Sequence, residues 1–523
     1  MLTSNDTGRS VWTRSSGDPI WGWVGTVLVF GCALGLFYAH NRFSLGLHFD
    51  EPPKIRAAVQ ENWNFRHPLL MVETTRLVVR ALGVSDLQAA VEVGRTLSAS
   101  MGAVAVAAMF RLTLLHAGLV PALLVCFAAL TTPLLAVHAH YLKEDVWLLP
   151  FCVLATIGYS RLAKENMVLQ IVLLGIWIGL AISSKAVGIF LIPVLLIAAG
   201  LETSAVRGRL VKAVLQASAL AIVVVLLVNL RMLFNYEKAL KDLLSELAHG
   251  TIDGHWDKVV YPIGYHFTSS LAQGVGVPFL IIGILGMFGS FLRWRSSEPI
   301  DRLMAIYALT YYGMIEVSPL KAWPDIERYA LPLILPLTYF CGRTIAYVRH
   351  QLAALPKPAL ANAVVVWTAA FALLPTAVTG IRLVGELEAD TRIVAERLLA
   401  GKGLQVITER YGPSVGVQVA SIAMDAPRVA SPGVRNLVTS SFLYGRFAVG
   451  VSVGGSRNKT ALEIWSAYEA IFKMPYCEIS PRVMSYGMSN PTIRIIDLSA
   501  ARAPDRSSRL TTSSLPPQCA SAP

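Results

Sequence analysis

The amino-acid sequence predicts a polytopic α-helical membrane protein that ends in a small α/β domain outside the membrane. Of its 523 residues, 54% are hydrophobic and only 15% are charged, with a mean hydropathy of +0.55. A soluble globular domain carries about 25% charged residues, so an ordinary cytosolic enzyme is excluded. The basic residues flank apolar runs, so the net charge of +12 indicates membrane topology and not nucleic-acid binding.

The apolar residues fall into runs that predict membrane-spanning helices. Such a helix needs about 20 mostly apolar residues, because hydrocarbon leaves no partner for exposed backbone polar groups. We expect about eleven spans, with only a short turn at Ser183, Ser184 and Lys185 between the fifth and the sixth. The predicted spans lie near residues 20–39, 93–113, 119–137, 146–162, 168–184, 187–201, 212–234, 273–293, 302–318, 328–348 and 360–382.

The distribution of Lys and Arg between loops predicts the orientation. If the tail of residues 1–19 is cytoplasmic, the short inner loops hold twelve basic residues and the short outer ones four. This asymmetry obeys the positive-inside rule. The first span, behind a short basic tail, is expected to be an uncleaved signal anchor. An odd number of spans then leaves everything beyond residue 383 outside.

Three longer segments fall on the outer side: residues 40–92, 235–272 and 383–500. The first contains a helical stretch, 54–83, that is too charged to cross lipid and is expected to lie at the interface as juxtamembrane helices. Residues 501–523 form a tail rich in Ser and Pro, which predicts disorder.

The third outer segment, 383–500, is expected to be a compact α/β domain. Helical and strand patterns alternate along it, which favours a folded module over a linker. The predicted elements are a helix at 390–400, a strand at 404–409, a helix at 459–473 and a strand at 491–498.

Two acids, Asp50 and Glu51, follow the first span on its outer side. A carboxylate there could act as general base toward an acceptor hydroxyl or amine, and its neighbour could position that acceptor or a metal. The alternative is a solvated pair that caps a helix, since Pro52 and Pro53 suit the first turn of one. The spacing alone leaves both interpretations open.

A second polar group, residues 138–145, occupies the outer turn between the third and fourth spans. His138, His140, Glu144 and Asp145 supply ligand types for a divalent cation. The spacing matches no zinc motif, and oxygen-rich sites suit Mg or Mn better. The alternative is that the histidines simply lie at the interface.

A third group is cationic and consists of Lys185, Lys321 and Arg328, all near the outer surface. An Arg can hold a phosphate through two parallel hydrogen bonds, whereas a Lys acts as a point charge. Either side chain could instead extend toward lipid head groups. Outer acids together with outer cations suit an enzyme that takes a phosphate-linked group from a lipid carrier.

Several short motifs occur in a characteristic order along residues 20–380, and this part of the chain resembles the GT-C glycosyltransferases. The closest likeness is to the protein O-mannosyltransferase and lipid A aminoarabinose transferase group. The motifs are Asp50-Glu51, Arg66-His67-Pro68-Leu69, Gly94-Arg95-Thr96-Leu97-Ser98, Asp145 after His138-Ala139-His140-Tyr141, the turn Gly179 to Lys185, and Glu327-Arg328-Tyr329-Ala330-Leu331-Pro332.

The resemblance implies a polyprenyl-phosphate-sugar donor, with a protein, lipid or glycan as acceptor. It matches Asp50 to the catalytic base, Glu51 to its companion, and Asp145, with Glu144, to the second acid of the outer loops. It also implies that Lys185, Arg328 and Tyr329 lie near the donor phosphate. The implied location is a bacterial cytoplasmic (inner) membrane, with the active site on the extracytoplasmic side.

Two other classes of function compete with a glycosyltransferase. A secondary transporter or lipid flippase would place its polar residues near the bilayer midplane and show two related halves, which this sequence lacks. A scaffold built around residues 383–500 would not need Asp50, Asp145 and Arg328 on one side. No nucleotide-binding Gly-rich loop occurs, which excludes ATP-driven transport by this chain alone.

Overall fold

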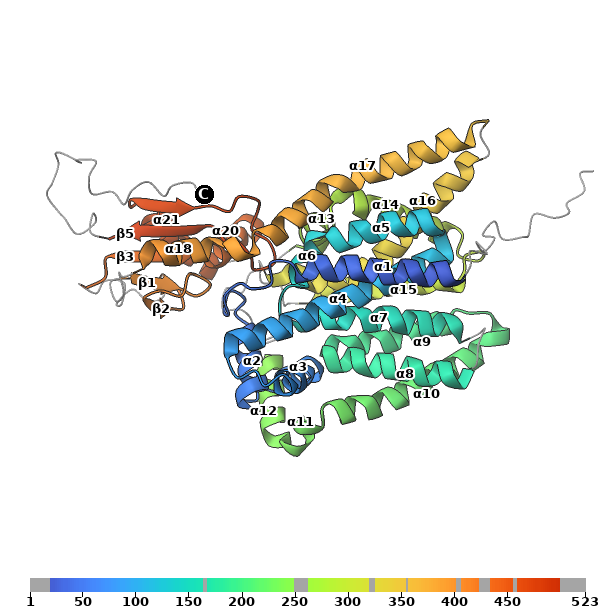
Figure 1. The fold of residues 1–523 in the computed structure, drawn as a ribbon, viewed down its shortest axis with the longest axis horizontal. Coiled ribbons are helices and arrows are strands. Elements are labelled where there is room, and N and C mark those ends of the chain that lie inside the picture. Colours follow the sequence, from blue (N-terminus) through green and yellow to red (C-terminus); the bar gives the residue numbers. More distant parts are fainter. Residues whose placement is uncertain are drawn as a thin grey trace, which may run out of the picture.

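The computed structural model consists of a helical bundle with a β-sheet domain at one end (Figure 1). The tails at 1–18 and 501–523, Lys321 and part of the outer segment 235–272 lie outside the described residues. The structure describes residues 19–162, 167–248, 262–318, 325–353, 356–400, 406–422, 433–454 and 459–498.

All eleven apolar runs of the sequence fold as helices or pairs of helices. The 31-residue α4 is the central one and packs against α1, α5, α7 and α16. The helices of the bundle are α1 (Pro19–Tyr38), α4 (Leu87–Ala117), α5 (Leu119–Thr131), α6 (Pro133–His138), α7 (Glu144–Arg161), α8 (Met167–Ser184), η1 (Ala186–Phe190), α9 (Leu191–Gly200), α10 (Ser204–Val228), η3 (His266–Leu271), α13 (Ala272–Val275), α14 (Val277–Leu292), α15 (Pro299–Val317), η4 (Asp325–Leu333), α16 (Ile334–Ala353) and α17 (Pro358–Gly385).

Fewer than eleven of the described helices qualify as membrane spans by length and composition alone. Six described helices are long and apolar enough to cross a membrane, or seven if the bent pair His266–Val275 and Val277–Leu292 counts as one span. Helices α5 and α9 are short, and α7 and α15 each carry three charged residues. The expected total of eleven spans therefore stays a prediction.

The helical stretch expected at 54–83, interpreted as juxtamembrane helices, is divided into two helices. The chain forms α2 (Glu51–Gln60) and α3 (Leu70–Ala81), and the segment between them is irregular. Helix α2 ends at Glu61, whose backbone is left-handed (φ +57°), and Pro68 then favours an extended backbone before α3. Two further helices, α11 (Leu230–Phe234) and α12 (Tyr236–Ala248), follow α10 at the same end of the bundle as α2 and α3 (Figure 1).

The C-terminal domain is a three-layer α/β module, and the four predicted elements are present. Its sheet has the strand order β2-β1-β3-β5-β4, in which β1 is parallel to β2 and β3 whereas β5 is antiparallel to β3 and β4. The elements are η5 (Leu387–Ala389), α18 (Thr391–Leu399), β1 (Val406–Glu409), β2 (Val417–Val419), β3 (Asn436–Ser440), α20 (Ser441–Gly454), α21 (Lys459–Ile471), β4 (Tyr476–Ile479) and β5 (Ile493–Asp497).

Successive side chains of the central strands β3 and β5 point to opposite faces of the sheet, and each face is covered by helices. Leu437 and Ile496 lie in one hydrophobic cluster together with Phe442 of α20 and Tyr468 of α21. Their neighbour Val438 lies in a separate cluster that contains residues of α18. Successive side chains of a strand point to opposite faces, so the sheet buries both faces between helices.

Candidate active site

The structure brings the predicted acids and cations together at the end of the bundle nearest the C-terminal domain. Asp50 precedes α2, Glu144 and Asp145 open α7, Lys185 precedes η1, and Arg328 lies in η4. These positions are up to 278 residues apart in sequence. The packing of the helices therefore brings together residues that are far apart in the sequence.

Asp50 is paired with two cations and does not cap its helix. It occupies the N-cap position of α2, but its side chain makes no capping hydrogen bond. Its Oδ2 instead forms ion pairs with Lys143 and with Nη1 of Arg328, the latter at 3.2 Å. Of the two interpretations of Asp50, the helix cap is therefore not supported by this geometry.

Glu144 and Asp145 each have their own lysine. Nζ of Lys54 donates to Oε2 of Glu144 at 2.7 Å, and Nζ of Lys185 donates to Oδ1 of Asp145. The second oxygen of Asp145 lies 4.0 Å from Nε of Arg328. Arg328 thus lies between Asp50 and Asp145 and links the two acids.

The resulting group contains four cations and three acids: Lys54, Lys143, Lys185, Arg328, Asp50, Glu144 and Asp145. We call it the outer charge cluster, after the side on which the sequence predicts these loops. Its excess of positive charge favours an anionic ligand. Exposure is concentrated on three members: the side chain of Asp50 is 23% exposed, that of Lys185 18% and that of Arg328 11%. A ligand that approaches from solvent would therefore meet the carboxylate of Asp50 together with its partner Arg328 and with Lys185, the partner of Asp145.

Tyr329 contributes an aromatic face beside both cations. Its ring centroid lies 4.9 Å from Nζ of Lys185 and 5.4 Å from the guanidinium carbon of Arg328. Such contacts stabilise a cation by about 0.5–2 kcal/mol and restrict its position. The backbone carbonyl of Tyr329 accepts a hydrogen bond from the hydroxyl of Tyr311 at 3.0 Å, which fixes η4 against α15.

Glu51 is fully buried, beneath the outer charge cluster. Its carboxylate forms a bidentate pair with Arg95 of α4, at 2.9 Å from Nε and 2.5 Å from Nη2. The backbone N–H of Leu142 donates to the same carboxylate at 3.0 Å. These contacts give Glu51 a positioning role, because it ties the start of α2 to α4 and to the loop before α7.

His48 holds the backbone of Asp50 from the other side. Its ring is fully buried and lies 4.7 Å from the ring centroid of Tyr141, and its Nδ1 accepts a hydrogen bond from the N–H of Asp50 at 3.3 Å. Burial, together with Lys143 and Arg328, holds the pKa of His48 well below its usual value. The imidazole is therefore neutral at pH 7, as an acceptor must be.

The structure does not support the metal site expected at His138, His140, Glu144 and Asp145. Both ring nitrogens of His140 face backbone carbonyls, of Ala136 at 2.6 Å and of Ala39 at 2.8 Å. His138 lies against the ring of Tyr486, and the two acids are paired with lysines. Within the described part of the chain, no three His, Cys, Asp or Glu side chains are grouped to hold a metal ion.

Sequence reasoning missed Lys54, Lys143 and Arg95 as parts of this site. An arginine inside an otherwise apolar helix is costly unless it is paired, so Arg95 carried a signal. Lys54 lies one turn after Asp50 and Lys143 directly before Glu144, but neither spacing indicates a partner. Burial lowers the pKa of Lys54, although its ion pair with Glu144 opposes this shift.

Comparison with known proteins identifies the fold. A family profile described as dolichyl-phosphate-mannose-protein mannosyltransferase matches residues 67–230. ArnT from Cupriavidus metallidurans in the apo state superimposes with a TM-score of 0.52 at 14% identity, over 93% of this chain and 100% of that one. The same protein bound to undecaprenyl phosphate gives 0.50 at 14% identity, over 92% and 98%. In a comparison with curated protein sequences, none matches.

An archaeal relative shares the fold across most of its length. The oligosaccharyltransferase AglB from Archaeoglobus fulgidus, in complex with an inhibitory peptide and a dolichol-phosphate, gives a TM-score of 0.53 at 11% identity, over 89% of this chain and 74% of that one. The protein thus has the fold of the GT-C glycosyltransferases. The family profile covers about a third of the chain and is similar to the group that the sequence motifs resemble.

Proposed function

We propose that the protein transfers a sugar from a polyprenyl-phosphate-linked donor to a protein, lipid or glycan acceptor on the outer face of a bacterial inner membrane. The observation that carries this proposal is the position of Asp50, the most exposed acid of the outer charge cluster. It is paired with Arg328, which also lies beside Asp145, the partner of Lys185. ArnT, which has the same fold, binds undecaprenyl phosphate, and this supports the kind of donor.

The proposed reaction is a single displacement at the anomeric carbon. An acceptor hydroxyl or amine attacks that carbon and forms the new glycosidic bond, while Asp50 takes its proton. The bond from the carbon to the phosphate oxygen breaks, and the polyprenyl phosphate leaves with the electron pair. Arg328 and Lys185 stabilise the charge on the leaving phosphate, so no separate protein acid is needed. One displacement inverts the configuration of the sugar carbon.

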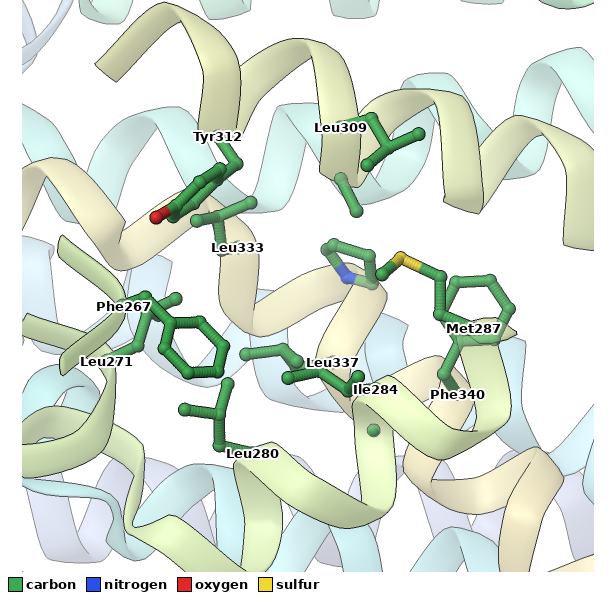
Figure 2. A pocket seen from close by; sticks show the side chains of 13 residues that line it. Phe267, Leu271, Leu280, Ile284, Met287, Leu309, Tyr312, Leu333, Leu337 and Phe340 are labelled. Carbon is green, nitrogen blue, oxygen red and sulfur yellow. The ribbon is translucent and has the colours of Figure 1, made fainter. Parts of the chain in front are cut away.

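An apolar cavity of about 270 Å³ between α14, α15 and α16 offers space for part of the isoprenoid tail (Figure 2). Leu280, Leu309 and Leu337 line it, and the hydroxyl of Tyr312 is the one polar side-chain group among the lining residues. Leu333 belongs both to this lining and to η4, the element that carries Arg328. A carrier lipid could therefore have its phosphate at one end of η4 and its tail at the other.

The distribution of charge argues against the transporter alternative. A substrate site of a transporter is expected near the bilayer midplane, between discontinuous helices of two related halves. The outer charge cluster instead lies at one end of the bundle, at the first turn of α7 and the loops that contact it. Mass spectrometry of lipid-linked sugars from strains with and without the gene tests whether the protein is a glycosyltransferase. We expect one polyprenyl-phosphate sugar to accumulate without the gene, and an unchanged set of lipid-linked sugars would refute the proposal.

The outer location of the site predicts the outcome of a reporter fusion. A reporter that is active only in the cytoplasm, inserted after Asp390, should be inactive, because α17 leads out of the membrane toward the C-terminal domain. The same reporter placed between α14 and α15, after Ser296, should be active, since that loop is expected inside and is basic. The reverse pattern would place the whole site on the cytoplasmic face.

A further inference from the structure

The segment that carries Asp50 is held on one side by the bundle and on the other by the C-terminal domain. Glu51 is fixed to Arg95 of α4, and His48 lies against Tyr141. Leu47 and Phe49, between and beside them, also contact residues beyond 385, namely Arg392 and Tyr411. The C-terminal domain therefore contributes to the position of a side chain that it does not contain.

The first of these contacts is a buried arginine. Arg392, at the start of α18, is held by Asp390 through two hydrogen bonds of 2.8 Å. Its Nη1 donates to the backbone carbonyl of Leu47 at 2.6 Å, and its Nη2 donates to the carbonyl of Met488 at 2.9 Å. The side chains of Arg392 and Asp390 are each 2% exposed, so this hydrogen bond is shielded from water and restricts the backbone three residues before Asp50.

The second contact is aromatic. Phe49 packs against the hydrophobic cluster formed by α20, α21 and the sheet, and its ring lies edge-on to Tyr411 with centroids 5.2 Å apart. Tyr411 follows β1, and its backbone has a left-handed φ of +68°. The guanidinium carbon of Arg446, from α20, lies 4.9 Å from the Tyr411 ring centroid, and Nη2 of Arg446 donates to its hydroxyl at 3.3 Å. Tyr411 is thus fixed in the domain and presents a rigid ring to Phe49.

We propose that Tyr411 is a positioning residue for the reaction, which acts through Phe49 on the neighbouring carboxylate of Asp50. The inference rests on the proposed function, since it assumes that Asp50 takes the proton of the acceptor. General base catalysis requires hydrogen-bond reach to that proton, and a displacement of about 1 Å can cost about 100-fold in rate. The donor phosphate is held by Arg328 and Lys185, which belong to the bundle. Loss of the Tyr411 ring should therefore lower kcat and leave donor binding unchanged.

The test compares three full-length variants purified in lipid nanodiscs. Tyr411→Ala removes the ring, and Tyr411→Phe keeps it and removes only the hydroxyl. Tyr444→Ala is the matched control, because Tyr444 is as buried as Tyr411, at 9% against 8% exposed, and packs edge-on against Phe472 in the same domain. The donor is the lipid extract of a strain that lacks the gene, and membranes of that strain supply the acceptor.

We expect the saturating rate of Tyr411→Ala to fall about 10-fold to 100-fold, with a donor KM within about twofold of wild type. Tyr411→Phe and Tyr444→Ala should stay within about threefold of the wild-type rate. If Tyr411→Ala does not fold, Phe49→Leu keeps an apolar side chain, removes the ring contact from the other side, and should show the same fall in kcat.

Two results would overturn this inference. One is a wild-type kcat for Tyr411→Ala, and the other is an equal loss in Tyr444→Ala, which would mean that general packing of the domain is responsible. Measuring Asp50→Asn in the same assay separates the role of Asp50 as the base from the role of Tyr411 in positioning it. If Asp50→Asn turns over normally, the base assignment itself fails, whereas an inactive Asp50→Asn beside a fully active Tyr411→Ala refutes only the role of Tyr411.

Discussion

Replacing Asp50 by Asn is expected to abolish transfer in a protein that still folds, inserts into the membrane and binds donor. Asn keeps the size of Asp, and the start of α2 persists because Pro52 and Pro53 occupy its first turn and no side-chain cap is lost. The proton-accepting carboxylate is removed. Loss of a positioned general base costs about 10²–10⁴-fold in rate. The measurement is the initial rate of sugar transfer, together with binding of undecaprenyl phosphate by the same preparation.

Asp145→Asn gives the matched comparison, because Asp145 is buried, is paired with Lys185 and lies beside Arg328. Asp145→Asn should loosen the positions of Lys185 and Arg328 and so reduce donor binding. A rate for Asp50→Asn within a few-fold of wild type would exclude Asp50 as the base. A water molecule activated by Asp145 would then be the next candidate for the general base.

The second large effect is expected at the cations. Arg328→Ala should weaken binding of undecaprenyl phosphate about 10-fold to 100-fold, as expected for the loss of hydrogen bonds to a charged group worth about 1.5–3 kcal/mol. Lys185→Ala should weaken it less, because a planar guanidinium can hold two phosphate oxygens whereas an ammonium acts as a point charge. The affinity can be measured from the rise in melting temperature on titration with undecaprenyl phosphate.

Arg328→Lys is the control for this experiment, since it keeps the charge and loses the planar geometry. Its affinity for undecaprenyl phosphate should lie between those of wild type and Arg328→Ala. Wild-type affinity in both alanine variants would show that neither cation holds the phosphate. That result would remove the phosphate-binding assignment but not the proposal of a glycosyltransferase, which the fold and the family profile support independently.

Local patterns predicted the helices of this protein well, because a long apolar run determines a helix without reference to the rest of the chain. The break within 54–83 was missed although Asn62, Asn64 and Pro68 lie at it, all typical of loops. Strands β2, β3 and β4 were missed for a different reason. β2 and β4 have three and four residues, and β3 has only two apolar residues, Leu437 and Val438, among its five, so none of them stands out as a strand in the sequence.

The candidate site was predictable in its residue types and its side of the bundle, but not in its pairings. Asp50, Asp145, Lys185 and Arg328 were expected together because their loops share one side of the predicted topology. The pair of Glu51 with Arg95 spans 44 residues, and that of Lys54 with Glu144 spans 90. Such partners depend on how the helices pack, which no local pattern contains. The grouping of His138, His140, Glu144 and Asp145 as metal ligands is not formed for the same reason, because lysines pair with both acids.

The proposed function requires that this chain consume a polyprenyl-phosphate sugar by means of Asp50. Its most direct test is the level of lipid-linked sugars in a strain that lacks the gene and is complemented with either wild type or Asp50→Asn at equal membrane abundance. We expect wild type to clear the accumulated donor and to restore one envelope glycan, and Asp50→Asn to leave the donor at the level of the deletion strain. Clearance by Asp50→Asn at the wild-type level would contradict the account.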